Sequence, residues 1–248
     1  EDDTQIKLSG NKIWNEYDEA EELGITTKPM LTGAYTMLKL CRYTGNKSAA
    51  DYVGDIVKAY KELLQTCEKK QIAWVQFDEP ALVLDMSDED KKLFHEIYDE
   101  LLACSTDTKI LLQTYFGDIR DIYEDVIKMS FAGIGIDFIE GKQSYELVSK
   151  FGFPKDRVLF AGLVNGKNIW KNHYDKTLKI VNELADKGID TVISTSCSLL
   201  HVPYTLENEE KLSKEYTAYF SFAKEKLIEL NELGKLTDNK NYCDDEAY

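Results

Sequence analysis

The sequence lacks the features that mark several large classes of protein. No apolar run approaches the ~20 residues that a membrane-spanning helix needs, and no secretory signal pattern is present. No G-x-G-x-x-G or Walker-type glycine loop follows an apolar run, which disfavours nucleotide binding. Only 3 histidines occur, so a histidine-based metal site has few candidates. We therefore expect a soluble chain without a membrane partner.

Paired cysteines and clustered positive charges are also missing. The 5 cysteines lie far apart and form no C-x-x-C pair, a pattern that predicts reduced thiols in a cytoplasmic protein. Against 45 Asp and Glu stand 30 Lys and Arg, which gives a formal charge of −15. Because nucleic acids are bound by clustered Lys and Arg, we expect no nucleic-acid partner. The first residue is Glu rather than Met, which predicts that the polypeptide is part of something longer.

What the sequence does contain is a regular alternation of short apolar runs and amphipathic helices. A short acidic helix is expected at 17–23, closed by Gly24. The chain should end in a long helix at about 207–233. Each apolar run is nearly continuous, as expected of parallel strands buried on both faces. The predicted strands are 28–32, 73–78, 110–115, 133–138, 158–163 and 191–195.

This alternation allows a doubly wound open sheet or a (β/α)₈ barrel of the TIM type. Polar residues gather at the ends of several strands, which favours the barrel. Six strands instead of eight predict an incomplete barrel whose first two strands are missing. We expect this partial barrel at 1–235 and an acidic mobile tail at 236–248. The unpaired edges of such a barrel would permit an edge-mediated dimer.

Two adjacent carboxylates, Asp78 and Glu79, follow the strand at 73–78, and Pro80 ends that strand. Neighbouring strand residues point to opposite sides, so the two acids should not face each other. One of them could act as an acid, a base or a ligand-orienting group at the barrel mouth. A glycosidase would need a second carboxylate, which Asp137 or Asp118 could supply. The structural alternative, which we favour slightly, is that one carboxylate holds neighbouring loop amides or a lysine.

The last strand is followed by a second group of polar residues. Cys197 and His201 lie four residues apart, so they could bind zinc or act as nucleophile and base. We favour a different interpretation about twice as strongly, in which these residues form a buried polar turn that closes the last strand. The Asn165-Gly166 dipeptide is typical of a tight turn at a strand end. It could contact an anionic ligand, although a simple connection explains it better.

Five segments together, in this order, resemble the N-terminal half of the cobalamin-independent methionine synthases. The resemblance runs from about residue 5 to 233. The segments are KPMLTG at 28–33, WVQFDEPALVL at 74–84, QTYFG at 113–117, GLVNGKNIW at 162–170 and SCSLLHVP at 196–203.

The resemblance implies a methyltransferase that moves a methyl group from a 5-methyltetrahydrofolate polyglutamate to homocysteine. Such enzymes look like two face-to-face barrels, with zinc and homocysteine in the C-terminal barrel. Bound zinc lowers the pKa of the homocysteine thiol, so that a thiolate is present to attack the methyl group. The positions that match the zinc ligands of that barrel hold Thr114, Phe116, Asp137 and Cys197 here. Thr and Phe cannot complete a zinc site, so Cys197 is better interpreted as a remnant.

The resemblance therefore predicts an N-terminal barrel fragment that supports folate binding and the C-terminal catalytic barrel, its expected partner. It predicts no metal, no cofactor and no catalytic residue in this chain, which should be inactive alone. The ligand-binding candidates are Asp78, Glu79, Asp137, Asn165, Cys197 and His201. Two alternatives remain: a non-catalytic module that binds folate or a small anion, and a barrel hydrolase that uses Asp78 or Glu79 with Asp137.

Overall fold

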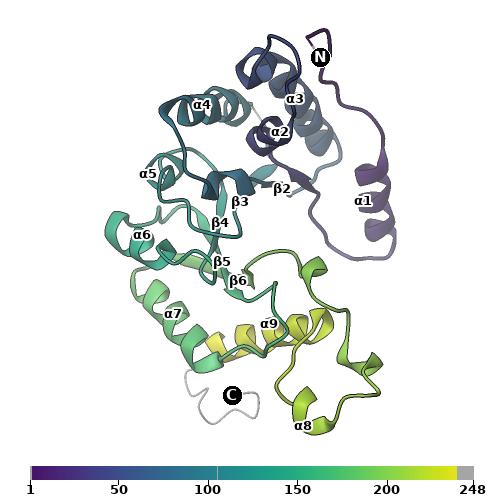
Figure 1. The fold of residues 1–248 in the computed structure, drawn as a ribbon, viewed down its shortest axis with the longest axis vertical. Coiled ribbons are helices and arrows are strands. Elements are labelled where there is room, and N and C mark those ends of the chain that lie inside the picture. Colours follow the sequence, from purple (N-terminus) through teal and green to yellow (C-terminus); the bar gives the residue numbers. More distant parts are fainter. Residues whose placement is uncertain (1, 105, 239–248) are drawn as a thin grey trace. The chain divides into compact units, whose positions relative to one another are not determined.

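The structure is a computed structural model that describes residues 2–104 and 106–238, and it has an α/β fold (Figure 1). All six predicted strands are confirmed to within two residues at either end. The strands are β1 (Met30–Thr32), β2 (Trp74–Asp78), β3 (Lys109–Gln113), β4 (Gly133–Asp137), β5 (Val158–Val164) and β6 (Asp190–Thr195). They follow one another across the sheet in chain order, and the pairs β1–β2, β2–β3 and β5–β6 are parallel.

Helices alternate with these strands, as the sequence pattern indicates. The α-helices are α1 (Lys12–Glu22), α2 (Ala34–Leu40), α3 (Val53–Lys69), α4 (Asp88–Leu102), α5 (Tyr123–Val126), α6 (Ser144–Phe151), α7 (Tyr174–Asp186), α8 (Lys214–Thr217) and α9 (Ala223–Asp238). Four short 3₁₀ segments join them in the described part: η1 (Ala49–Tyr52), η2 (Pro80–Val83), η3 (Leu199–His201) and η4 (Leu206–Asn208). No helix of residues 2–104 and 106–238 combines the length and the apolar character needed to cross a bilayer.

The chain forms two units. The first contains the residues up to Thr114 together with Ile119–Ile134, and the second contains Tyr115–Asp118 and the residues from Gly135 onward. In the first unit α2, α3 and α4 are grouped near β2 and β3 (Figure 1). Aromatic rings pack between these elements: Tyr60 of α3 lies edge-on to Phe77 of β2 at 5.3 Å, and Phe94 of α4 meets Tyr35 of α2 at 5.9 Å.

The core of the second unit includes apolar residues of α7, α9 and β5. Leu178 of α7 packs with Leu233 and Leu236 of α9 and with Val164 of β5, and all four side chains are buried. Figure 1 shows α7 and α9 side by side. Such close packing of apolar side chains is the main force that holds a short helix in place.

The single long helix predicted at 207–233 is wrong. Instead η4, α8 and α9 follow one another, and residues 219–221 between α8 and α9 are not helical. An antiparallel bridge joins Trp170 to Phe220: the Lys171 N–H donates to the Tyr219 carbonyl (3.0 Å), and the Ser221 N–H donates to the Ile169 carbonyl (2.6 Å). These tertiary hydrogen bonds use backbone groups that a continuous helix would need.

Both ends of the described chain differ from the predicted boundaries. The first helix begins at Lys12, five residues earlier than expected, and Gly24 follows it with φ +71, as a helix-stopping glycine should. At the other end, α9 runs to Asp238 and buries Leu236, so the predicted tail at 236–248 begins with helix. Residues 239–248 lie outside the described residues.

Candidate functional site

Glu79 follows β2 directly and lies fully buried in the first unit. One carboxylate oxygen accepts the N–H of Tyr35 (2.9 Å), and the other accepts the N–H of Thr36 (2.7 Å). The Tyr98 hydroxyl also donates to this carboxylate. The two amides belong to the first turn of α2, whose N-cap is Gly33 and therefore has no capping side chain. Glu79 supplies the missing cap and places its negative charge at the helix N-terminus.

Close packing surrounds this cap. A Cβ atom added to Gly33 would lie 2.2 Å from the carboxyl carbon of Glu79, so only glycine fits there. Burial raises the pKa of Glu79 from 4.5 to about 7, while the hydrogen bonds from Thr36, Tyr98 and Tyr35 act in the opposite direction. The sequence analysis favoured a structural role in which a carboxylate holds loop amides or a lysine; Glu79 instead holds the amides of a helix N-terminus.

Asp78 ends β2 and is also largely buried. Its carboxylate accepts a hydrogen bond from the Gln76 side-chain amide (2.7 Å), and the positive charge of Lys28 lies near enough to interact with it. The Asp78 carbonyl accepts the N–H of Gly33 (2.6 Å), which ties the end of β2 to the end of β1. Asp78 and Glu79 thus have separate partners and do not act as a carboxylate pair.

Asp137 ends β4 in the second unit and is buried. Its carboxylate accepts three backbone N–H groups, from Phe116 (2.9 Å), Ile139 (2.8 Å) and Glu140 (2.9 Å). Burial raises the pKa of Asp137, and these N–H groups oppose the change. Phe116 has φ +74, a conformation that is strained for a bulky residue. Asp137 therefore holds a strained loop in place.

The ring of Phe116 lies beside His201, a predicted candidate, and beside Lys167, which the sequence analysis did not single out. The centres of the Phe116 and His201 rings are 5.3 Å apart in an edge-to-face arrangement, and the Lys167 ammonium lies 5.0 Å from the Phe116 ring centre. Lys167 also pairs with Glu140 at 3.0 Å. The nearest sequence signal is the Asn165-Gly166 turn, which immediately precedes Lys167. The structure thus brings both Asp137 and His201 into contact with Phe116, the first through its backbone N–H and the second through its ring.

Asn165 forms the turn that the sequence predicts. Its side-chain oxygen accepts the N–H groups of Lys167 (2.8 Å) and Asn168 (3.0 Å). The Gly166 N–H donates to the Ser196 hydroxyl (3.1 Å), and a Cβ atom at Gly166 would lie 2.5 Å from the Cys197 carbonyl oxygen. The turn after β5 is therefore packed directly on the segment after β6.

Cys197 is buried in this turn, and burial raises the pKa of its thiol. Its sulfur lies 3.8 Å from the Ser198 carbonyl oxygen, to which it can donate. His201 is exposed and packs on Phe116. No set of three or more His, Cys, Asp or Glu side chains in the described part of the chain could hold a metal ion. These features match the buried polar turn rather than a nucleophile and its base.

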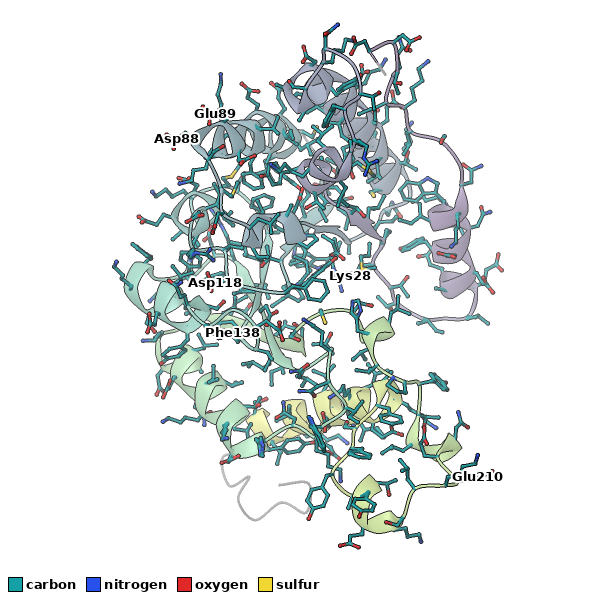
Figure 2. The ribbon with its side chains drawn as sticks, in the orientation of Figure 1. Lys28, Asp88, Glu89, Asp118, Phe138 and Glu210 are labelled. Atoms are coloured by element: carbon teal, nitrogen blue, oxygen red, sulfur yellow. The ribbon has the colours of Figure 1, made fainter. Side chains whose placement is uncertain are left out.

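A cavity of about 420 Å³ opens beside Asn165 in the second unit. Apolar side chains form part of it, including Phe138, which directly follows β4 and is labelled in Figure 2. The exposed ring of Trp170 and the side chain of Lys176 also line it. An aromatic ring beside positive charge suits a flat organic anion. Sequence reasoning found Asn165 but missed Trp170 and Lys176, because nothing in the pattern links them to one cavity.

The geometry argues against a hydrolase. Such an enzyme needs carboxyl groups that can reach a substrate and exchange protons with it. Both oxygens of Glu79 and both oxygens of Asp137 already accept backbone N–H groups. Asp118, labelled in Figure 2, is buried and accepts the N–H of Gln143 (3.3 Å). These acids organise loops.

Comparisons with known proteins point to one family. Residues 1–189 match the family described as "Cobalamin-independent synthase, N-terminal domain". A 5-methyltetrahydropteroyltriglutamate–homocysteine methyltransferase of Lactococcus lactis is 51% identical over 239 residues, which are 96% of this chain and 31% of that protein. One from Campylobacter jejuni is 50% identical over 234 residues, with 94% and 31% covered. The chain thus spans about a third of the length of these curated relatives.

A solved structure is similar in fold. A B12-independent methionine synthase from a Shewanella species, determined in complex with selenomethionine, superimposes with a TM-score of 0.69. The match covers 96% of this chain and 69% of that chain at 14% sequence identity. At that identity the likeness concerns the fold alone.

Proposed function

We propose, from the premise that the chain belongs to the cobalamin-independent methionine synthase family and carries its N-terminal domain, that it forms part of a methyltransferase. The whole protein would transfer a methyl group from 5-methyltetrahydropteroyltriglutamate, a 5-methyltetrahydrofolate polyglutamate, to homocysteine and so form methionine. The observation that carries the proposal is the 51% identity, over nearly the whole chain, to a relative named for that reaction. We also propose a cytoplasmic location for this protein, which is consistent with the free cysteines among the described residues.

The finer architecture that we propose is an incomplete (β/α)₈ barrel that lacks the first two strands. The parallel pairing of β1, β2 and β3 supports it, as does the pairing of β5 with β6. Polar side chains at the carboxyl ends of β2, β4 and β5 suit a barrel mouth, where ligands of such folds bind. The C-terminal catalytic barrel of the whole protein is the proposed partner of this mouth.

The metal chemistry is proposed to belong to that other half of the protein. The residues at the matching positions here do not fit zinc. The carboxylate of Asp137 is engaged by three backbone amides, Phe116 offers no donor side chain, and Cys197 is a buried thiol with a raised pKa. We propose no reaction step through these residues, and we place no catalytic residue in this chain.

The contribution of this chain is proposed to be folate binding and support of the catalytic half. The cavity beside Asn165 is the proposed place of contact, because Trp170 offers a ring face and Lys176 a positive charge. Among the predicted ligand-binding residues, Asn165 lines this cavity and is proposed to face the ligand, while Asp78 and His201 lie outside its lining. Glu79, Asp137 and Cys197 are proposed to shape the surrounding loops, because their polar atoms already have protein partners.

A methyl-transfer assay tests the division of labour. The 248-residue chain, given homocysteine, zinc and 5-methyltetrahydropteroyltriglutamate, should form no methionine above the blank, whereas the longer protein that contains it should turn over. Turnover by the chain alone would contradict the proposed absence of catalytic residues.

Ligand titration tests the binding role and separates it from the second candidate, a non-catalytic module for a small anion. That candidate is favoured by the lysines that line the same cavity. Lys176→Ala should weaken binding of the methyltetrahydrofolate triglutamate by about fivefold, as expected for the loss of one partly exposed ion pair. Lys179→Ala, which removes an exposed lysine of the same helix outside the cavity, is the matched control. Binding of glutamate or phosphate but not of folate would favour the anion module.

A further inference from the structure

A larger cavity lies in the second unit on the side of α9, and it shares Lys171, Asn172 and His173 with the cavity beside Asn165. It measures about 690 Å³ and is bounded by the segment that leads into α7 and by one face of α9. None of the predicted site residues lines it. The proposed folate contact involves the cavity beside Asn165 and assigns no role to the face of α9 that lines this larger cavity.

The lining of this cavity is acidic. Three of its carboxylates come from α9, namely Glu225, Glu229 and Glu232, and a fourth comes from Asp175 at the start of α7. Lys171 is the one lysine that lines it, and His173 is also present. An excess of negative charge in a recess attracts cations and repels anions.

Two polar atoms of the lining are buried without a hydrogen-bond partner in the described residues. Glu229 is 6% exposed, and while its Oε1 accepts the N–H of Asn172 (2.9 Å), its Oε2 has no donor. The hydroxyl of Ser221, a residue that is 1% exposed, also has no partner. Buried polar atoms in proteins are nearly always paired, so both atoms indicate that a donor belongs beside them.

Lys226, a buried cation of α9, forms no hydrogen bond to either atom in the described residues. Lys226 is buried close to Glu229, and its positive charge interacts with that carboxylate. Its ammonium nevertheless donates to the Trp170 carbonyl (3.0 Å). An ammonium group has three donors and no acceptor, so it is suited to donate to a carboxylate oxygen such as Glu229 Oε2 and to a hydroxyl oxygen such as that of Ser221.

Two of the three remaining carboxylates are held in position by hydrogen bonds. Glu225 accepts hydrogen bonds from the Thr205 hydroxyl (2.8 Å) and the Phe222 N–H (3.1 Å), and Glu232 accepts one from the Tyr174 hydroxyl. Accepting a hydrogen bond does not neutralise a carboxylate, so Glu225 and Glu232 keep their negative charges. On a helix, residues 225, 229 and 232 share one face and are spaced by about 6 Å and about 4.5 Å along the axis.

This row of carboxylates suits a chain of positive charges better than a single ion. No group of His, Cys, Asp or Glu side chains in this lining, or elsewhere in the described residues, could hold a metal ion. Ammonium groups joined by short methylene spacers have a separation similar to that of the carboxylates. We propose that this cavity binds a linear polyamine, with one ammonium group on Glu229 and Ser221 and the next toward Glu225 or Glu232.

Titration of the 248-residue chain with spermidine, followed by calorimetry, tests the proposal. Saturable binding of one spermidine per chain is expected. Glu229→Gln should weaken it about tenfold or more, because it removes a charged acceptor. Ser221→Ala should weaken it without a change in charge, and because the hydroxyl has no partner in the ligand-free protein, this variant should not lose thermal stability. If Glu229→Gln does not fold, Ser221→Ala still decides the question.

The control is Glu215→Gln, which removes an exposed carboxylate of α8 outside the cavity. It should leave spermidine binding unchanged at moderate salt. Equal weakening by Glu215→Gln and Glu229→Gln would mean diffuse attraction to an acidic surface and would overturn the proposal. Absence of saturable binding, or unchanged binding in Ser221→Ala, would overturn it as well. None of these results depends on whether the chain takes part in methyl transfer.

Discussion

At the scale of single residues, the carboxylates at the strand ends act on the backbone. Glu79 caps α2, whose N-cap Gly33 has no side chain, and Asp137 holds three loop amides. Each carboxylate is buried, so the cost of desolvation is offset by hydrogen bonds to N–H groups. The location of these acids at strand ends was predictable from sequence, but the groups that they bind were not, because Tyr35 and Glu79 are 44 positions apart.

Replacement of Gly33 tests the close packing around the cap. Gly33→Ala should reduce the free energy of unfolding by about 1–3 kcal/mol, because the new methyl group would overlap the Glu79 carboxyl group. The backbone at Gly33 has a φ of −68 that alanine can adopt, so conformational strain does not contribute. Urea unfolding measures the effect. The matched control is Gly54→Ala in α3, where nothing lies within 4 Å. There alanine should stabilise the chain by about 0.5–1 kcal/mol. Equal effects of the two variants would refute the overlap.

The raised pKa of Glu79 predicts a pH-dependent stability. Between its ordinary value of 4.5 and about 7, the folded chain binds more protons at Glu79 than the unfolded chain does. Stability should therefore fall as the pH rises through this window, by on the order of 3 kcal/mol at 1.36 kcal/mol per pKa unit. The substituted side chain in Glu79→Gln cannot titrate, so the stability of this variant should not show this part of the pH dependence. At low pH the variant should be less stable than the unsubstituted chain. Unfolding curves at a series of pH values measure the difference, and parallel profiles for the two proteins would contradict the prediction.

At the scale of elements, the strands and the apolar periodicity of the longer helices follow local patterns, while helix boundaries and the irregular segments do not. β2, β3 and β4 are almost continuous apolar runs, and α3 shows a clear helical period, so each was predictable. The segment after β6 was not, because the bridge between Trp170 and Phe220 forms across 50 residues and interrupts a helix-like pattern. The Phe116 loop is another such element, since its strained residue depends on Asp137.

Substitution of Asp137 tests whether it holds that loop. Asp137→Asn keeps the shape but turns an amide donor toward one of the three N–H groups, so we expect a loss of about 1–3 kcal/mol in unfolding free energy. In a double-mutant cycle, Phe116→Gly should cost less in the Asp137→Asn background than alone, since glycine relieves the positive φ. Asp156→Asn, at an exposed carboxylate of the same unit, should have little effect. Strict additivity of the two substitutions would count against the coupling.

At the scale of the whole molecule, the two terminal strands of the sheet order differ from the central ones. β1 and β6 each have one hydrogen-bonded neighbour in that order, and both are less buried than β4. Exposed strand edges are templates for pairing with a second chain. The edge-mediated dimer therefore stays a prediction for this 248-residue chain.

Sedimentation at several concentrations measures this association. The chain should form dimers, and Val192→Lys on β6, where the valine is 42% exposed, should shift the population toward monomer. Leu227→Lys introduces the same charge at an exposed position of α9 and should leave the population of dimers unchanged. A concentration-independent monomer for the unsubstituted chain would eliminate the dimer.

The sequence alone determined the α/β class, the six strands and the family, because apolar periodicity and contiguous motifs are local properties that survive in a linear string. Tertiary structure decided what the conspicuous residues do. Glu79 caps a helix, and Asp137 accepts the backbone N–H of Phe116. Cys197 is a buried thiol packed against the turn at Asn165. The cavity beside α9 appeared only when Ser221 and Glu229 were brought together with the segment before α7. The role of a polar group depends on the partners that folding places within hydrogen-bond distance, and some of those partners, such as the Tyr35 and Thr36 amides bound by Glu79, lie far away along the chain.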